Sequence, residues 1–133
     1  MNLIPRPSDW EPPRIATRGE VDAALARRPD VAATFDLLVS DISSTLAWPR
    51  TEAAGFVIST AAVTLDFLED QKWLFAERVI ENVQQRMHDE FIDTSWPECP
   101  EHGRHPLWVR GGPPWLWKCR GVSVPLGELR SRS

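Results

Sequence analysis

Apolar residues recur every three or four positions through the first two thirds of the chain, the spacing of helices with one buried face. The first such segment starts with Thr17-x-x-Glu20, which has the form of a capping box and predicts a short helix that Pro29 ends. Asp30 is then expected to cap a second helix, which the pair Trp48-Pro49 stops. The apolar face of this second helix consists of Val31, Phe35, Leu38, Val39, Ile42 and Leu46.

Two more helices are predicted between Thr51 and Asp93, where no proline occurs. The third helix has two apolar stripes, typical of a central position in a bundle, although its β-branched residues also favour a strand. Asp70 is expected to cap the fourth helix. The stripes of the third helix are Val57, Ala61, Leu65 and Leu68 on one side and Phe56, Val63 and Phe67 on the other. The face of the fourth helix is Leu74, Phe75, Val79, Val83, Met87 and Phe91.

The pattern changes after Asp93, because prolines and glycines crowd residues 96–127 and the helical period is lost. Residues 107–110 and 115–119, joined by Gly111-Gly112-Pro113-Pro114, predict a β-hairpin with a longer loop, and residues 122–124 a third short strand. The four prolines within residues 1–16 predict an extended arm, which Trp10 would pin to the body. We therefore expect a mainly α protein divided into an arm (1–16), a helical bundle (17–94), a small β module (95–128) and a basic tail (129–133).

Composition and charge narrow the class of protein. The net charge is −4 over 133 residues, which argues against a protein that coats nucleic acid. The charge is uneven: residues 104–133 hold six basic residues against one acidic, a net of +5, which leaves −9 on the rest. No apolar run reaches the ~18 residues of a membrane span. The first residues lack the apolar core and cleavage site of a signal peptide, so we expect a cytoplasmic protein.

The module carries both cysteines of the chain and two of its three histidines, in the order Cys99-x2-His102-x2-His105-x13-Cys119. A segment this short lies below the ~40 residues under which a domain usually needs a staple. Cytoplasmic thiols are kept reduced, so a metal is favoured over a disulfide. Zinc prefers four nitrogen or sulfur ligands in a tetrahedron. We predict one structural zinc ion on Cys99, His102, His105 and Cys119.

Three alternatives to this four-ligand site stay open. The two thiols and two histidines can lie together by coincidence, without a metal. Cys99 and Cys119 can instead form a disulfide. Within a metal site, one histidine can lie outside the ligand set, with Glu98, Glu101 or water completing the coordination.

The stretch Trp96-Pro97-Glu98-Cys99-Pro100-Glu101-His102-Gly103-Arg104-His105-Pro106-Leu107-Trp108, followed by Trp117-Lys118-Cys119, resembles the C-terminal ends of small uncharacterised bacterial proteins. Those ends look like degenerate zinc ribbons. The resemblance covers about a quarter of the chain and implies metal binding, with no activity attached. The usual ribbon has a cysteine or proline just after the distal cysteine, where this chain has Arg120-Gly121.

The predicted hairpin also interleaves aromatic and basic residues, as in strands that stack bases and follow phosphates. Alternatively, Trp115 and Trp117 share one strand face that packs on the bundle and joins the module to it, the interpretation that we favour. The residues of this candidate surface are Trp108, Arg110, Trp115, Trp117, Lys118 and Arg120.

We expect a non-enzymatic zinc-binding interaction protein whose module and tryptophans contact a protein partner or a second copy of the chain. The alternative is a nucleic-acid-binding regulatory protein that uses the basic hairpin and the tail arginines Arg130 and Arg132. A third class, a zinc-dependent hydrolase, is less favoured because the chain has neither a His-Glu-x-x-His helix nor the deaminase pattern.

Overall fold

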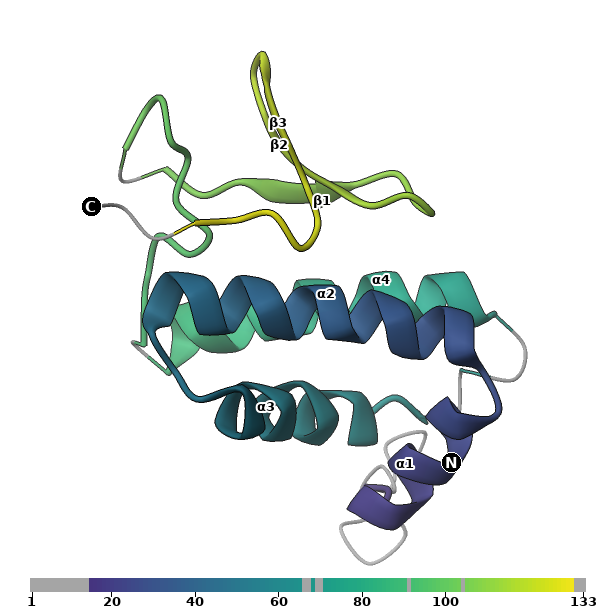
Figure 1. Cartoon of the computed structure of the whole chain (residues 1–133). Helices are drawn as coiled ribbons and strands as arrows, with labels where there is room; N and C mark the ends of the chain where they lie inside the picture. Colours follow the sequence, from purple (N-terminus) through teal and green to yellow (C-terminus); the bar gives the residue numbers. More distant parts are fainter. Residues whose placement is uncertain (1–14, 66–67, 69–70, 91, 104, 131–133) are drawn as a thin grey trace, which may run out of the picture.

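The structure is a computed structural model that describes residues 15–65, 68, 71–90, 92–103 and 105–130. Four helices packed together are followed by a three-stranded antiparallel sheet, as the sequence predicts (Figure 1). The helices are α1 (Arg18–Ala26), α2 (Pro29–Leu46), α3 (Arg50–Ala62) and α4 (Lys72–Asp89). The strands are β1 (Trp108–Arg110), β2 (Leu116–Cys119) and β3 (Val122–Pro125).

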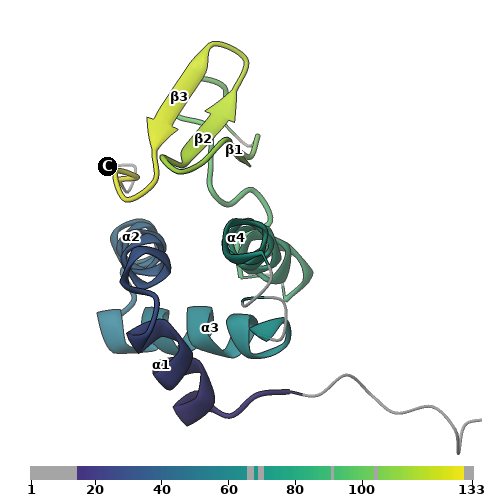
Figure 2. The ribbon, with the colours of Figure 1, turned by 90° about the vertical axis from the view of Figure 1, so that its right-hand side faces the viewer.

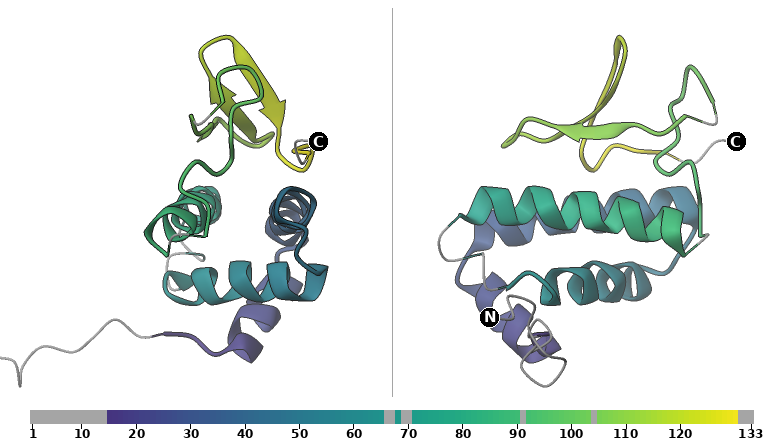
Figure 3. Two further views of the ribbon diagram at one scale, coloured as in Figure 1. Left: turned by 90° about the vertical axis from the view of Figure 1, so that its left-hand side faces the viewer. Right: turned by 180° about the vertical axis from the view of Figure 1, so that it is seen from behind.

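The molecule is built in three layers. Helices α2 and α4 lie side by side in the middle layer, α3 crosses beneath them, and the sheet covers their opposite side (Figure 2). Seen from behind, β1 runs above α4, while α1 stands at the end of the bundle away from the sheet (Figure 3). The middle pair therefore has apolar partners on both sides.

The predicted capping box at the start of α1 is confirmed. The Thr17 hydroxyl accepts from the Glu20 backbone N–H, and the Glu20 carboxylate accepts in return from the Thr17 N–H, each at 3.2 Å. The predicted cap of α2 is wrong. Arg28 is the residue before the helix and Pro29 is its first residue, because a proline fits a first turn where no N–H donor is needed. Asp30 lies within that first turn, where its carboxylate accepts from the Val31 N–H at 2.9 Å.

The predicted apolar face of α2 is confirmed, since five of its six residues are buried and Leu46 is half-buried. The segment with many β-branched residues is helical, as predicted, but α3 ends at Ala62 and Val63 is half exposed. In α4, Phe75, Val79, Val83 and Met87 are buried, while Leu74 is exposed. Asp70, Phe67 and Phe91 of the predicted pattern lie outside the described residues, and Gln71 precedes α4 without a side-chain cap.

The predicted hairpin and third strand are both present, in the strand order β1-β2-β3. Val109 pairs with Trp117, and Trp117 pairs with Val124, so one side of the sheet is apolar across all three strands. A two-residue turn joins β2 and β3, and its Gly121 has the positive φ of 69° that glycine adopts at little cost.

A single apolar core joins the sheet to the helices, and it includes Trp96, Leu107 and Trp117 of the predicted module. Residues 1–14 of the predicted arm, Trp10 among them, lie outside the described residues. Ala16 is buried, and its N–H donates to the Ala62 carbonyl at 3.0 Å, which fixes the entry to α1. Within the described ranges, no helix is both long enough and apolar enough to cross a membrane.

Candidate metal centre and adjoining basic groove

A tight turn brings Cys99 and His102 together ahead of β1. The Gly103 N–H donates to the Cys99 carbonyl at 3.1 Å, and Gly103 has the left-handed φ of 60° that this reversal requires. The turn is closed at its base, where the Cys99 N–H donates to the His105 carbonyl at 2.7 Å. The Leu107 N–H donates to the Pro97 carbonyl at the same distance and completes an antiparallel bridge. The local backbone therefore aims two side chains at one point.

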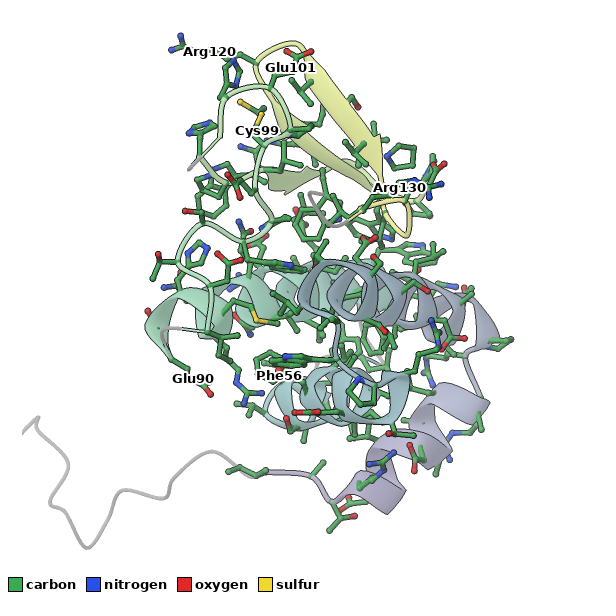
Figure 4. All side chains as sticks on the ribbon, turned by 60° about the vertical axis from the view of Figure 1, so that its left-hand side comes forward. Phe56, Glu90, Cys99, Glu101, Arg120 and Arg130 are labelled. Atoms are coloured by element: carbon green, nitrogen blue, oxygen red, sulfur yellow. The ribbon has the colours of Figure 1, made fainter. Side chains whose placement is uncertain are left out.

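Cys119 joins this pair from the end of β2, although it lies seventeen residues beyond His102 in the sequence. His102 Nδ1 is 3.2 Å from the Cys99 sulfur and 3.3 Å from the Cys119 sulfur. The three ligand atoms all lie within 4.8 Å of one another and form a Cys2His group that can hold a metal ion. Figure 4 shows Cys99 and Arg120 at the end of the sheet that is farthest from the helices.

The spacing of these atoms fits a tetrahedral zinc ion closely. Zinc–sulfur bonds of ~2.3 Å and zinc–nitrogen bonds of ~2.0–2.1 Å place sulfur and nitrogen roughly 3.5 Å apart across a tetrahedral edge. The two sulfur–nitrogen distances in the structure, 3.2 and 3.3 Å, are shorter by only a few tenths of an ångström. Small outward movements of the side chains would admit the ion.

Cys99 and Cys119 are not joined by a disulfide in the structure, so that alternative is not formed. Burial raises the pKa of the Cys119 thiol, and the neighbouring Cys99 sulfur raises it further. The thiolate is the form that binds a metal. The protein environment alone therefore favours the neutral thiol of Cys119, and a bound cation would have to provide the positive charge that stabilises its thiolate.

His105 is the one predicted ligand that the structure leaves outside the three-atom group. Its imidazole stands nearly perpendicular to that of His102, with the ring centroids 5.9 Å apart. Glu101, an alternative fourth ligand, is exposed at the same end of the sheet (Figure 4). The identity of a fourth ligand stays a prediction.

Where the sheet meets the helices, at the end away from the metal centre, one buried carboxylate of α2 bonds to it. Asp41 accepts three hydrogen bonds, from Trp117 Nε1 at 2.8 Å, from the Gly127 N–H at 2.8 Å and from the Leu129 N–H at 2.9 Å. Burial raises the pKa of Asp41 above its usual value, and these three donors oppose that effect only in part. Asp41 therefore holds both β2 and the segment after β3 against the bundle.

We call the contacts that hold the sheet and its flanking segments on α2 and α4 the dock. Besides Asp41, the dock includes three further polar contacts. Trp96 Nε1 donates to the Thr45 hydroxyl at 2.8 Å, and the Trp96 ring packs edge-on against Trp117. Gln84 donates to the Leu107 carbonyl at 2.7 Å. His88 Nε2 lies 2.8 Å from the Trp96 carbonyl, which only accepts, so this nitrogen carries the proton.

The dock separates the tryptophans of the candidate surface into two sets. Trp115 and Trp117 are buried, so the face that they share is the inner face of the sheet, and their rings are not accessible to a partner. Trp115 packs edge-on against Trp73 at the start of α4. The favoured interpretation, in which this face joins the module to the bundle, is confirmed. Trp108 lies on the outer face and is 42% exposed.

The remaining candidate residues gather in one open groove of about 420 Å³ on the outer face of β1 and β2. Its lining combines three cations, one tryptophan, one histidine and one cysteine of the metal centre: Arg110, Lys118, Arg120, Trp108, His105 and Cys119. Trp108 pairs with Lys118 across the two strands, which places the aromatic ring beside a cation. Of the tail arginines, Arg130 lies near α2 and does not line this groove, and Arg132 falls outside the described residues.

The residues of the dock are the ones that the sequence interpretation missed. Asp41 and Thr45, four residues apart, follow one margin of the apolar face of α2, and Gln84 and His88 do the same on α4. A polar residue at the margin of an apolar stripe is common on any surface helix. These four positions differ from ordinary surface positions only because the sheet forms a second apolar layer above α2 and α4.

Comparisons with protein-family models, with curated proteins and with solved structures found no match to this chain. What the chain shows is a small antiparallel C-terminal sheet with a Cys/His cluster, packed on α2 and α4 of a four-helix bundle.

Proposed function

We propose that this chain is a non-enzymatic zinc-binding protein, in which a structural zinc ion on Cys99, His102 and Cys119 stiffens a module that binds a partner. The observation that carries the proposal is the convergence of these three donors from two segments of the chain. Two thiolates and an imidazole are soft and borderline ligands of the kind that selects zinc among the common divalent ions. His105 is the fourth ligand that we propose, since it follows His102 by three residues and its ring is adjacent.

The site's position at the end of the sheet supports a structural role. The dock fixes the sheet where it meets α2 and α4, but the turn that carries Cys99 and the end of β2 lie beyond the reach of the helices (Figure 4). An ion there would join these two segments and make the outer face rigid. Structural zinc ions supply folding free energy of this kind.

The lining of the groove supports binding rather than hydrolysis. A zinc hydrolase pairs its metal-bound water with a general base, commonly a carboxylate. None of the described residues that line the groove beside Cys119 is acidic. The hydrolase alternative would require an exchangeable water in place of His105.

The exposed side chains favour an anionic partner. With Trp115 and Trp117 in the core, the module offers one accessible tryptophan surrounded by cations, instead of the broad aromatic surface that anchors many protein partners. These exposed residues therefore support a nucleic acid, the alternative partner predicted from the sequence, over a protein partner.

Cobalt titration of the metal-free protein tests the metal part of this proposal. We expect one equivalent of Co²⁺ to give the absorption of a thiolate-ligated tetrahedral site, and Zn²⁺ to displace it. Cys119→Ser and His102→Ala should abolish the spectrum, while Ser123→Ala, an exposed change on β3, should not. A Co²⁺ spectrum without thiolate charge transfer would contradict the proposal.

A further inference from the structure

Proteins hold single-stranded nucleic acids without reading their sequence by means of exposed aromatic rings and a cationic track. The outer face of β1 and β2 has one such ring, Trp108, beside three cations. Trp108 and Arg110 alternate with the buried Val109 on β1, so both point outward. Lys118 is exposed beside them on β2, directly across from Trp108. Arg120 follows at the turn, and the four side chains line one groove.

The ring of Trp108 packs against a side chain of α4. Its ring meets His88 nearly at right angles, with the centroids 6.3 Å apart. His88 is itself fixed by its hydrogen bond to the Trp96 carbonyl. The Trp108 ring lies outside the core, is 42% exposed and is oriented by a neighbouring side chain. Such an aromatic ring is suited to contact a ligand.

We propose that this groove binds single-stranded nucleic acid, with one base stacked on Trp108 and adjacent phosphates on Arg110, Lys118 and Arg120. The volume of about 420 Å³ falls within the ~300–1,000 Å³ of small-ligand sites, enough for a nucleotide unit rather than a folded partner. An open groove with an exposed ring for stacking also suits a single strand better than a duplex, whose bases are already stacked. This inference rests on the proposed zinc-held module, because Cys119 belongs to both the metal group and the groove.

Fluorescence anisotropy with a labelled eight-nucleotide oligothymidine, on the full chain in its metal-loaded form, tests this inference. Three neutralised phosphates should give a slope of about −2 for log affinity against log salt. Trp108→Ala should weaken binding by about 5- to 150-fold, the effect of losing one stacked base, and Trp108→Phe should recover most of it. Lys118→Ala should reduce the salt slope by about 0.7.

Two matched variants control for general effects. Arg27→Ala removes an exposed cation at the end of α1, away from the sheet, and Leu74→Ala removes an exposed apolar side chain on α4. Neither should change the affinity. The metal content of each sample, measured in parallel, separates a failure of the groove from a failure of the zinc site.

Unlabelled competitors distinguish a single strand from other anions that could bind the groove. We expect a matched duplex, thymidine monophosphate and a glutamate-rich peptide each to compete more weakly than the unlabelled strand. Failure to bind the strand at low salt, equal competition by the peptide or the free nucleotide, or unchanged binding by Trp108→Ala would each overturn the inference.

Discussion

The two ends of the C-terminal sheet are held in different ways. Where it meets the helices, tryptophan rings fill the space between layers, and three neutral N–H donors, two of them in buried settings, bond to Asp41. At the far end, the buried Cys99, the half-buried Cys119 and the exposed imidazole of His102 meet at one point. The first end follows the logic of a protein core, and the second has the ligands of a metal site.

This difference explains how a sheet of three short strands is stabilised although the helices cover only part of it. A small sheet with one apolar face is stable only when that face is covered. The helices cover the inner face, but they do not reach the turn at Cys99 or the end of β2. The following changes separate the two ends, in order of decreasing expected effect.

Cys99→Ser should have the largest effect, because zinc binding is worth about 10–16 kcal/mol in small zinc-dependent peptides. We expect the metal to be lost and amide protection to fall across residues 96–121, while most of the helical circular dichroism remains. Hydrogen exchange followed by mass spectrometry measures this directly. Ser123→Ala in the same module is the control. Retention of stoichiometric metal by Cys99→Ser would contradict the ligand assignment.

Trp117→Ala should destabilise the whole protein by about 3–5 kcal/mol, the usual cost of removing a buried aromatic side chain. Its ring is fully buried between Trp96 and the helices, and it also donates to Asp41. Urea unfolding of the metal-loaded protein measures the change. Trp108→Ala, on the exposed side of the same sheet, should cost less than about 1 kcal/mol. Equal losses in the two variants would refute the assignment of inner and outer faces.

Asp41→Ala should cost about 3 kcal/mol, the lower end of the sum for three N–H donors left without their acceptor at about 1–3 kcal/mol each, because the Gly127 donor is only partly buried. Asp36→Ala removes an exposed carboxylate from the same helix and should change stability by no more than about 0.5 kcal/mol. Urea unfolding of both variants gives the comparison. A small effect at Asp41 would mean that water replaces the carboxylate.

The smallest expected effect is a difference in pH dependence between the two ends. The pKa of Asp41 is raised in the folded protein, so its titration adds stability below its ordinary value of 3.8, and this stability is lost as the pH rises through the raised value. Mild acid should therefore strengthen the dock, whereas protons compete with the metal for thiolates and imidazole. The stability of the wild type relative to Asp41→Asn should increase as the pH falls towards 4. A decrease, measured by urea unfolding at several pH values, would contradict the sign.

The helices and strands follow from local sequence patterns to a considerable extent. The capping box at Thr17, the apolar face of α2 and the hairpin of 107–119 are each encoded within a few neighbouring residues. The predicted cap at Asp30 is wrong because proline can begin a helix as well as end one, and Pro29 is the first residue of α2. The Cys99 and His102 pairing follows from a tight turn, while the approach of Cys119 depends on the register of β1 and β2.

The sequence favoured the face of Trp115 and Trp117 as the one that packs on the bundle, but it left the opposite assignment open. Trp108 and Trp117 both lie in strands rich in aromatic and basic residues, and only the position of the helices decides which face is covered. Asp41 was missed for the same reason, since its three donors come from residues 76 or more positions away. Long-range contacts of this kind leave no periodic signal.

The most direct test of the metal centre is elemental mass spectrometry of the purified chain combined with hydrogen exchange before and after chelation. We predict close to one zinc ion per chain, and a loss of amide protection confined to residues 96–121 when the ion is removed. Protein without stoichiometric metal, whose exchange in that segment is unchanged by chelator, would contradict the account.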